Sequence, residues 1–428
     1  MRSYYAHLST TDPVEATAVV PKPVFRSSAI FPVFQSAGIS SRILFLGYWL
    51  LKRNISQISA IISLRTLSGE LIGRLYQEIK EAKSYSYELK DFLSRAKINP
   101  SEEFSGSIEI ELYSGLGLVF PYPAVVINYY GPNFSSVVHT AQRIYNDYDD
   151  MQKNSQTEVP ESGFNLYADA NLEPFISIIN GPMGVPAAYI DFEFFNSTGE
   201  RLQHRKELGL LLPYQTRVIY PARECGLQEF LRGFVGFCRV HFNVSWIFPR
   251  LLVGNLCHEP KALAITHTYY DCIAAVSDSD YWQVPDPRWY PAALMVPLRS
   301  VDTYFTNLYF YPIYSSSKLA IDVEIYRSDG SLAGHKKSAL IVVSPGQELK
   351  ILKLKDLLEE LGIDKQEDLS AKIMATALEE SRVPARIKLG LDLGNEHLGL
   401  PCNICTNLQP YNPRYEGKRS SFKWAPLL

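Results

Sequence analysis

The sequence predicts a mainly β protein made of three tandem antiparallel β-sandwich repeats, Ig-like or jelly-roll-like, with short helical turns in the connections. Three observations predict this fold: an aromatic content of 12% dominated by Tyr and Phe, a polar hairpin turn that recurs, and strand and helix patterns that follow each turn in the same order. Tyr and Phe favour strands because they fit the pleated, half-buried surface of a sheet.

The recurring hairpin turn is the strongest of these signals. Each copy places a glycine in a short polar segment between two apolar strands, at Gly69, Gly199 and Gly330. The glycines are spaced by roughly 130 residues, about the length of one sandwich domain. Glycine supplies the positive φ angle that tight hairpins need.

Two further patterns follow each hairpin. A short amphipathic helix is expected at residues 88–93, 227–231 and 353–358, and in the third copy Gly362 stands where a helix C-cap belongs. Each copy then ends in a polar strand that carries His or Cys, at residues 137–140, 265–268 and 403–406. Chance similarity among Tyr- and Leu-rich strands is the alternative.

The patterns divide the chain into an N-terminal extension and three repeats. The expected limits are residues 1–26 for the extension, and 27–150, 151–285 and 286–428 for the repeats.

Composition limits the classes of partner. Hydrophobic residues make up 46% of 428 residues, which is enough for packed cores, and the net charge of −3 does not favour nucleic acid. No secretory signal or membrane-spanning run of about 20 apolar residues is found. We therefore expect a soluble, cytoplasmic protein with reduced cysteines. Composition does not predict its oligomeric state.

The polar end strands provide a candidate metal site. If the three repeats pack about a common axis, His139, His267 and Cys405 face one another there. Two imidazoles and a thiolate are suitable ligands for zinc. The alternative is that each residue lies on its own repeat, well apart from the others.

An aromatic group provides a candidate ligand-binding surface. Aromatic rings near carboxylates and Arg suit sugar faces and protein interfaces. The alternative is that these rings fill the joint between the second and third repeats. The residues are Tyr269, Tyr270, Tyr281, Trp282 and Trp289, together with Asp280 and Arg288.

Two other patterns allow metal chemistry. Cys402 and Cys405 form a Cys-x-x-Cys pair near His397, but a structural zinc site usually needs a second pair. The acidic connector at residues 146–150, echoed by Asp271 and Asp278, lacks the ligand order of an EF-hand loop. Two thiols in a loop and a solvated acidic loop are the alternatives.

No common catalytic motif is present: the chain has no phosphate loop, dinucleotide fingerprint, nucleophile elbow or His-Glu-x-x-His. The sequence therefore favours a non-catalytic binding or assembly protein, with a polysaccharide or a protein as partner. A metalloprotein or metal-dependent enzyme that uses the His/His/Cys triplet is the first alternative. A structural subunit of a larger particle or surface layer is the second.

Overall fold

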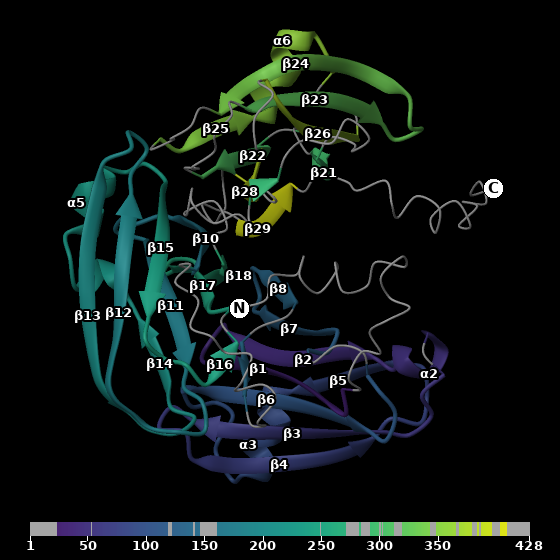
Figure 1. Ribbon diagram of the computed structural model, residues 1–428, viewed down its shortest axis with the longest axis vertical. Coiled ribbons are helices and arrows are strands. Elements are labelled where there is room, and N and C mark those ends of the chain that lie inside the picture. Colours follow the sequence, from purple (N-terminus) through teal and green to yellow (C-terminus); the bar gives the residue numbers. More distant parts are fainter. Residues whose placement is uncertain are drawn as a thin grey trace.

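The structure is a computed structural model that shows strands paired into antiparallel sheets, with few and short helices (Figure 1). It describes residues 24–52, 54–118, 122–139, 142–145, 161–248, 250–270, 282–283, 292–298, 301, 303–311, 319–342, 348–364, 368–378, 383–384, 387–395 and 403–408.

The first group of strands forms two four-stranded sheets that enclose one core; we call it the first sandwich. It also holds α2 (Tyr48–Lys52) and α3 (Leu89–Arg95). One sheet has the order β1 (Arg26–Gln35), β6 (Phe104–Ser114), β3 (Ile58–Thr66), β4 (Leu71–Glu78). The other has the order β5 (Ser84–Glu88), β2 (Ser40–Leu46), β7 (Val125–Tyr130), β8 (Ser135–His139).

The second group, the second sandwich, repeats this order and adds one strand. Its connections include the 3-10 turn η1 (Pro221–Arg223) and α5 (Leu227–Leu231). One sheet has the order β13 (Arg201–Leu211), β12 (Val185–Phe195), β15 (Gly236–Phe242), β10 (Glu161–Leu166), β19 (Tyr269–Tyr270). The other has the order β14 (Thr216–Ile219), β11 (Leu172–Ile179), β17 (Leu252–Cys257), β18 (Ala262–His267).

The third group, the third sandwich, contains α6 (Leu354–Leu361) and again two four-stranded sheets. One has the order β21 (Ala292–Leu298), β26 (Leu369–Ala377), β23 (Leu319–Arg327), β24 (Leu332–Val342). The other has the order β25 (Lys350–Lys353), β22 (Tyr304–Phe310), β28 (Ile387–Asn395), β29 (Asn403–Leu408). Two small ladders pair β9 (Arg143–Ile144) with β16 (Ile247–Phe248), and β20 (Trp282–Gln283) with β27 (Val383–Pro384).

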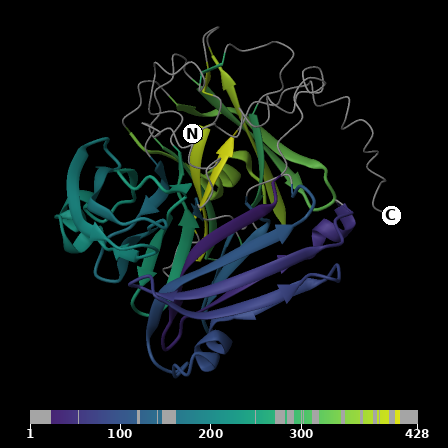
Figure 2. The same cartoon turned by 60° about the horizontal axis from the view of Figure 1, so that its bottom comes forward.

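The mainly β, antiparallel, sandwich-like fold predicted from the sequence is confirmed. The three groups use the same strand order, and Figures 1 and 2 show them around a centre where β8, β18 and β29 lie. That they are copies of one module, with the domain limits given above, stays a prediction.

The recurring turns occupy equivalent places in the fold. Gly69, Gly199 and Gly330 lie in the β3–β4, β12–β13 and β23–β24 hairpins, with φ angles of 93°, 85° and 81°. The expected helices also form, as α3, α5 and α6, and Gly362 ends α6 in the left-handed conformation with φ 64°. The hairpin and helix patterns therefore predicted local structure correctly.

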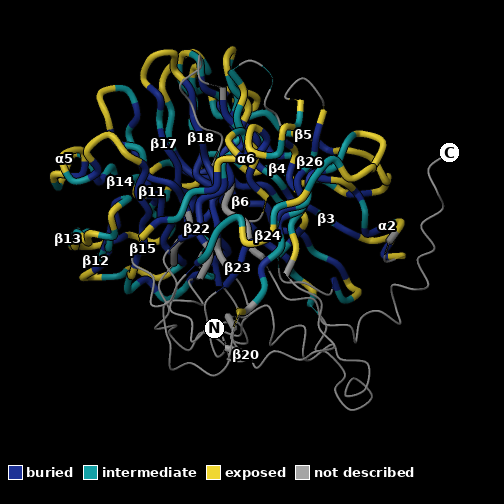
Figure 3. Tube along the Cα trace, turned by 90° about the horizontal axis from the view of Figure 1, so that it is seen from above, coloured by how far each residue is buried: buried dark blue, intermediate teal, exposed yellow. Residues whose placement is uncertain are grey.

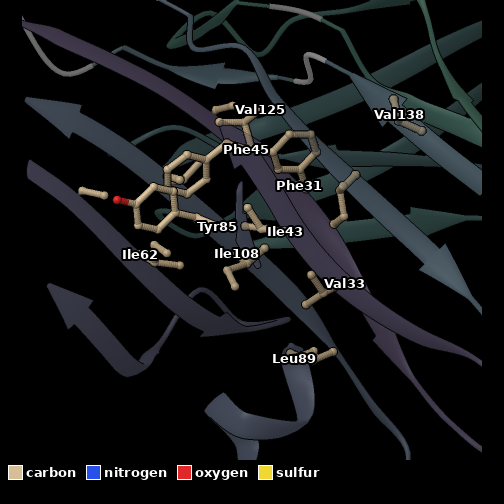
Figure 4. Close-up of a cluster of buried hydrophobic side chains, with 14 of the residues drawn as sticks. Phe31, Val33, Ile43, Phe45, Ile62, Tyr85, Leu89, Ile108, Val125 and Val138 are labelled. Carbon is tan, nitrogen blue, oxygen red and sulfur yellow. The ribbon is translucent and has the colours of Figure 1, made fainter. Parts of the chain in front are cut away.

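Alternating side chains build each core. In β6, Ile108, Ile110 and Leu112 are fully or almost fully buried between the two sheets of the first sandwich. Figure 4 shows this core, where Phe45 and Tyr85 from the second sheet stack with ring centroids 5.1 Å apart and Leu89 of α3 closes one end. Figure 3 shows burial concentrated along the strands and exposure at the turns.

The sandwiches also bury the outer faces of some strands against one another. Phe34 of the first sandwich meets Phe175 of β11 edge to face, with ring centroids 6.2 Å apart. Phe237 of β15 stacks on Tyr311, which follows β22, with ring centroids 4.4 Å apart. Apolar contacts thus continue across the first joint, between the first and second sandwiches, and across the second joint, between the second and third. Polar residues on these faces are buried with them.

The β3–β4 hairpin lies at the first of these joints. A Cβ atom on Gly69 would overlap the carbonyl oxygen of Pro213 and approach the backbone of Tyr214 to 2.8 Å. The turn is fixed there by a hydrogen bond of 2.9 Å from Thr216 N to Leu67 O.

We predict that Gly69→Ala destabilises the protein by at least about 2 kcal/mol more than Gly330→Ala does. Both substitutions place Ala at a positive φ angle, but the Cβ atom at Gly330 meets nothing within 4 Å. Urea denaturation of the two variants measures the difference. Equal losses would show that the Gly69 turn does not contact the second sandwich.

Candidate functional site

Three end strands meet at the centre of the molecule. β18 lies against both β8 and β29, so the last strands of the second sheets of all three sandwiches gather there (Figure 1). His139 is the last residue of β8 and His267 is the last residue of β18. Their rings are edge to face, with centroids 5.4 Å apart.

The two imidazoles differ in environment. His267 is buried, and its Nδ1 lies 2.7 Å from the carbonyl oxygen of Thr268. A hydrogen bond in this direction requires a proton on Nδ1, which leaves Nε2 as the acceptor nitrogen. The side chain of His139 is more exposed, yet desolvation by its neighbours and the positive charge of Arg250 lower its pKa. The lowered pKa favours the neutral imidazole of His139, the form that binds metals.

The third member of the predicted metal site is placed only by its strand. Cys405 lies on β29 opposite Gly390, and its side chain falls outside the described residues. Within the described part of the chain, no group of three or more His, Cys, Asp and Glu could hold a metal ion. The His139, His267 and Cys405 site therefore stays a prediction, with two of its members brought together.

Most of the predicted aromatic surface also lies outside the described residues. Tyr269 and Tyr270 form β19 and pair with Ser162 and Glu161, and Trp282 pairs with Pro384, but nothing is described of these three aromatic side chains. The same holds for other predicted positions. Those outside the described residues are Tyr281, Trp289, Asp280 and Arg288, the pair partner Cys402, His397, Asp271, Asp278 and the acidic connector.

The cysteines of the second sandwich are thiols. Cys225, Cys238 and Cys257 are free, and burial raises the pKa of each. Thiols of raised pKa are poor nucleophiles, so these three are structural residues.

A buried polar cluster joins the second and third sandwiches, and the sequence did not reveal it. Asp392 of β28 is fully buried. It receives hydrogen bonds from Tyr167, which follows β10, and from Asn165 of β10, whose Nδ2 lies 3.4 Å from Asp392 Oδ1. Burial raises the pKa of Asp392 to about 7, while the hydrogen bonds from Tyr167, Tyr309 and Asn165 act in the opposite direction.

A second cluster joins the first and second sandwiches. Arg26 Nε lies 2.8 Å from Glu111 Oε1, and Arg26 Nη2 lies 3.2 Å from Glu109 Oε1. The guanidinium of Arg65 stacks over the ring of Tyr214, 4.0 Å from its centroid. Burial, with the negative charge of Glu111, raises the pKa of Glu109.

Neither cluster has the form of a catalytic centre. Asp392 and Glu109 are 0% and 3% exposed, so a substrate cannot reach them without separating the sheets. Sequence alternation places Glu109 and Glu111 on the face of β6 opposite the core, which alone indicates solvent exposure. Only the packing of the sandwiches converts these faces into buried joints.

Exposed apolar side chains gather beside the first joint. Asn180 Nδ2 donates to the carbonyl oxygens of Met183 and Leu212, both at 2.8 Å, and Thr216 N donates to Leu67 O. These bonds bring three turns together at the lower left of Figure 1. The exposed side chains there, named the apolar corner, are Leu67, Leu71, Met183, Leu210 and Leu212, each between 41% and 57% exposed.

No segment of membrane-spanning character is found among the helices of the described residues; each is too short or too polar to cross a bilayer.

The fold thus defines a mainly β protein of paired antiparallel sheets. No protein-family model and no curated protein matches the chain. Among solved structures, a calcium-binding mutant of Bacteroides uniformis β-glucuronidase 2 aligns with 59% of this chain and 27% of its own, at 11% identity and a TM-score of 0.15.

The C-terminal domain of the Streptococcus pyogenes antigen I/II-family protein AspA aligns with 67% of this chain and 92% of its own, at 10% identity and a TM-score of 0.17. Of the β-glucuronidase described before it, this chain spans only about a quarter. At TM-scores this low, neither similarity supports a family or a function.

We predict that Arg26→Met lowers the free energy of unfolding by about 3–5 kcal/mol at pH 8, because it leaves two buried carboxylates without their main cation. The loss is smaller at pH 6, since removing Arg26 raises the pKa of Glu109 further and protonation then neutralises the carboxylate. Denaturant titrations at the two pH values measure this.

The matched control is Arg205→Met, which removes the cation from the exposed pair with Asp191. Solvent screens that pair, so its loss changes stability little. If both variants behave alike, Arg26 does not stabilise the buried carboxylates of β6.

Proposed function

We propose that this chain is a non-catalytic binding or assembly protein and that its partner is another protein. The apolar corner is the observation that carries the proposal. Five large aliphatic side chains exposed at one junction of turns are typical of a protein interface, because their burial is favourable and they offer few polar groups to desolvate.

The aliphatic character of the corner favours a protein over a polysaccharide. Sugar rings are typically bound on flat aromatic platforms with polar groups at the rim, whereas the corner consists of four Leu and one Met. The aromatic group near Trp282 keeps the polysaccharide as the alternative ligand. Assembly into a larger particle is the extension of the proposal in which the partner is a second copy of the chain.

We predict that the double variant Leu210→Ser and Leu212→Ser weakens partner binding at least tenfold, a loss of about 1.4 kcal/mol. Leu210 of β13 and Leu212, which follows β13, are both exposed on either side of buried Leu211, so the thermal midpoint changes little. Light scattering over a concentration series measures self-association, and cross-linking in cell extract followed by mass spectrometry measures other partners.

Leu332→Ser is the control, since Leu332 is also exposed but lies in the β23–β24 hairpin of the third sandwich. A wild-type protein that stays monomeric, captures no protein and binds to a glycan array contradicts the proposal. A double variant that binds as tightly as wild type does so too.

A second candidate function is that of a metalloprotein. The approach of the His139 and His267 rings to 5.4 Å favours it, because two imidazoles at this separation need only one or two further ligands to bind zinc. Cys405 is the proposed third ligand, from the strand that runs beside β18.

We predict that protein equilibrated with zinc and freed of excess metal retains about one equivalent, and that His139→Ala and His267→Ala each reduce it to background. His241→Ala, on the exposed side of β15, is the control. Elemental analysis measures the metal. Retention by either centre variant at the wild-type level excludes this site, and no retention by wild type excludes the function.

A further inference from the structure

Asp392 is the focus of the joint between the second and third sandwiches. Its carboxyl group is contacted by Tyr167 and Asn165, which lie more than two hundred residues earlier in the chain. Tyr311 Oη donates to Asn165 Oδ1 at 2.8 Å, and the hydroxyls of Tyr167 and Tyr309 lie 3.4 Å apart. Three tyrosines and one asparagine from the two sandwiches therefore surround one acid.

The backbone near this acid allows a very close approach. A Cβ atom on Gly390 would lie 2.5 Å from both Asn165 Oδ1 and Tyr311 Oη. Asn255 of β17 supports Asn165 from behind, donating from Nδ2 to Asn165 O at 2.9 Å and accepting from Tyr167 N at 3.1 Å. Separation of the sandwiches would leave the Asn255 bonds intact but would break together the bonds that Asn165 and Tyr167 form with the third sandwich.

The side chains that act on the pKa of Asp392 are neutral ones. The ionisable groups facing it are Tyr167 and Tyr309, and burial raises the pKa of both. On the flanking strands, exposed Lys353 of β25 lies opposite Asn307, and Cys405 of β29 lies opposite Gly390. Among the described residues, no cation contributes to the pKa of Asp392.

An ionised carboxylate at this position is costly because a buried charge needs a countercharge or full hydration. The protonated carboxyl is neutral and can donate its proton to a tyrosine oxygen while it accepts from Asn165. The closed joint therefore suits the protonated acid, and an opened, hydrated joint suits the carboxylate.

We propose that the Asp392 cluster is a proton-controlled latch between the second and third sandwiches: protonation of Asp392 keeps the joint closed, and ionisation loosens it. The inference concerns the interior of the molecule and stands whether or not the apolar corner binds a protein. Opening would expose the aromatic surface around Phe195, Phe237 and Tyr311, which the closed joint covers.

The sign of the pH dependence follows from linkage. In the closed joint the pKa of Asp392 is raised to about 7, whereas a hydrated Asp has a pKa of about 4. The closed form thus holds more protons between these values. The ratio of open to closed molecules rises up to about tenfold per pH unit from pH 4 to 7, and levels off above pH 7.

Hydrogen exchange at the amides of β22 and β28 tests the latch. Protection factors correct for the intrinsic pH dependence of exchange and report the opening equilibrium. In wild type they are expected to fall by roughly a hundredfold between pH 5 and 7, and to stay constant from pH 7.5 to 8.5. Asp392→Asn mimics the protonated acid, so its protection should not change over this range.

Glu324→Gln is the matched control within the same sandwich. Glu324 pairs with Lys372 at 3.0 Å on the exposed face, and hydrogen bonds from Tyr326 and Lys372 lower its pKa. This variant should keep the wild-type fall in protection. Amides of β2 and β7, in the sheet of the first sandwich that does not carry Glu109, control for changes elsewhere in the molecule.

Tyr167→Phe provides a second variant should Asp392→Asn fail to fold. The Tyr167 hydroxyl stabilises the carboxylate and lowers the pKa of Asp392, so its removal should move the fall in protection to higher pH. Infrared spectroscopy of wild type should also show a protonated carboxyl band at pH 6 that disappears by pH 8, and that is weaker in Asp392→Asn because only Glu109 then contributes to it. A flat wild-type profile, an unchanged slope in Asp392→Asn, or no such band at pH 6 overturns the latch.

Discussion

The arrangement of the three sandwiches depends on hydrogen bonding at the outer faces of sheets, where one sandwich covers another. Each sandwich encloses its own apolar core, but the outer faces of β1, β10 and β28 are also covered by a neighbouring sandwich. Buried polar groups cost free energy unless they are hydrogen-bonded. Gln142 shows how this is achieved. Its side-chain amide donates to the carbonyl oxygen of Ile179 in β11 and accepts from Ile179 N, while its backbone carbonyl accepts from Ile30 N at 2.8 Å. One side chain thus replaces a missing strand partner at the first joint.

Local structure was predictable from the sequence because its causes are local. The glycine hairpins, the amphipathic α6 and its Gly362 cap each follow from a few neighbouring residues and their backbone preferences. The joints were not predictable in this way. Asp392 alternates with Leu389 and Leu391 in β28, a pattern that indicates a core face and a solvent face. Nothing in the strand itself shows that a second sandwich covers its polar side.

The approach of the two central histidines was predictable in part. Their similar positions at the ends of two polar strands suggested proximity only if the sandwiches gathered about one centre, and the edge-to-face rings of His139 and His267 show that those two strands do meet. Whether a thiolate joins them depends on the Cys405 side chain, which strand order cannot place. Topology therefore brings the candidate residues together, while the ligand set remains a matter of side-chain chemistry.

The two joints surround a buried acid with different groups: cations at the first joint, and hydroxyl and amide groups at the second. At the first joint, Arg26 and Arg65 face Glu109, so its ionised carboxylate retains countercharges, although burial and Glu111 still raise its pKa to about 7. At the second joint, hydroxyl and amide groups replace the cations, and they can compensate a full negative charge only in part. Because the pKa of Glu109 is also raised, the first joint is expected to lose stability over the same pH range, but its ionised acid keeps two countercharges that Asp392 lacks.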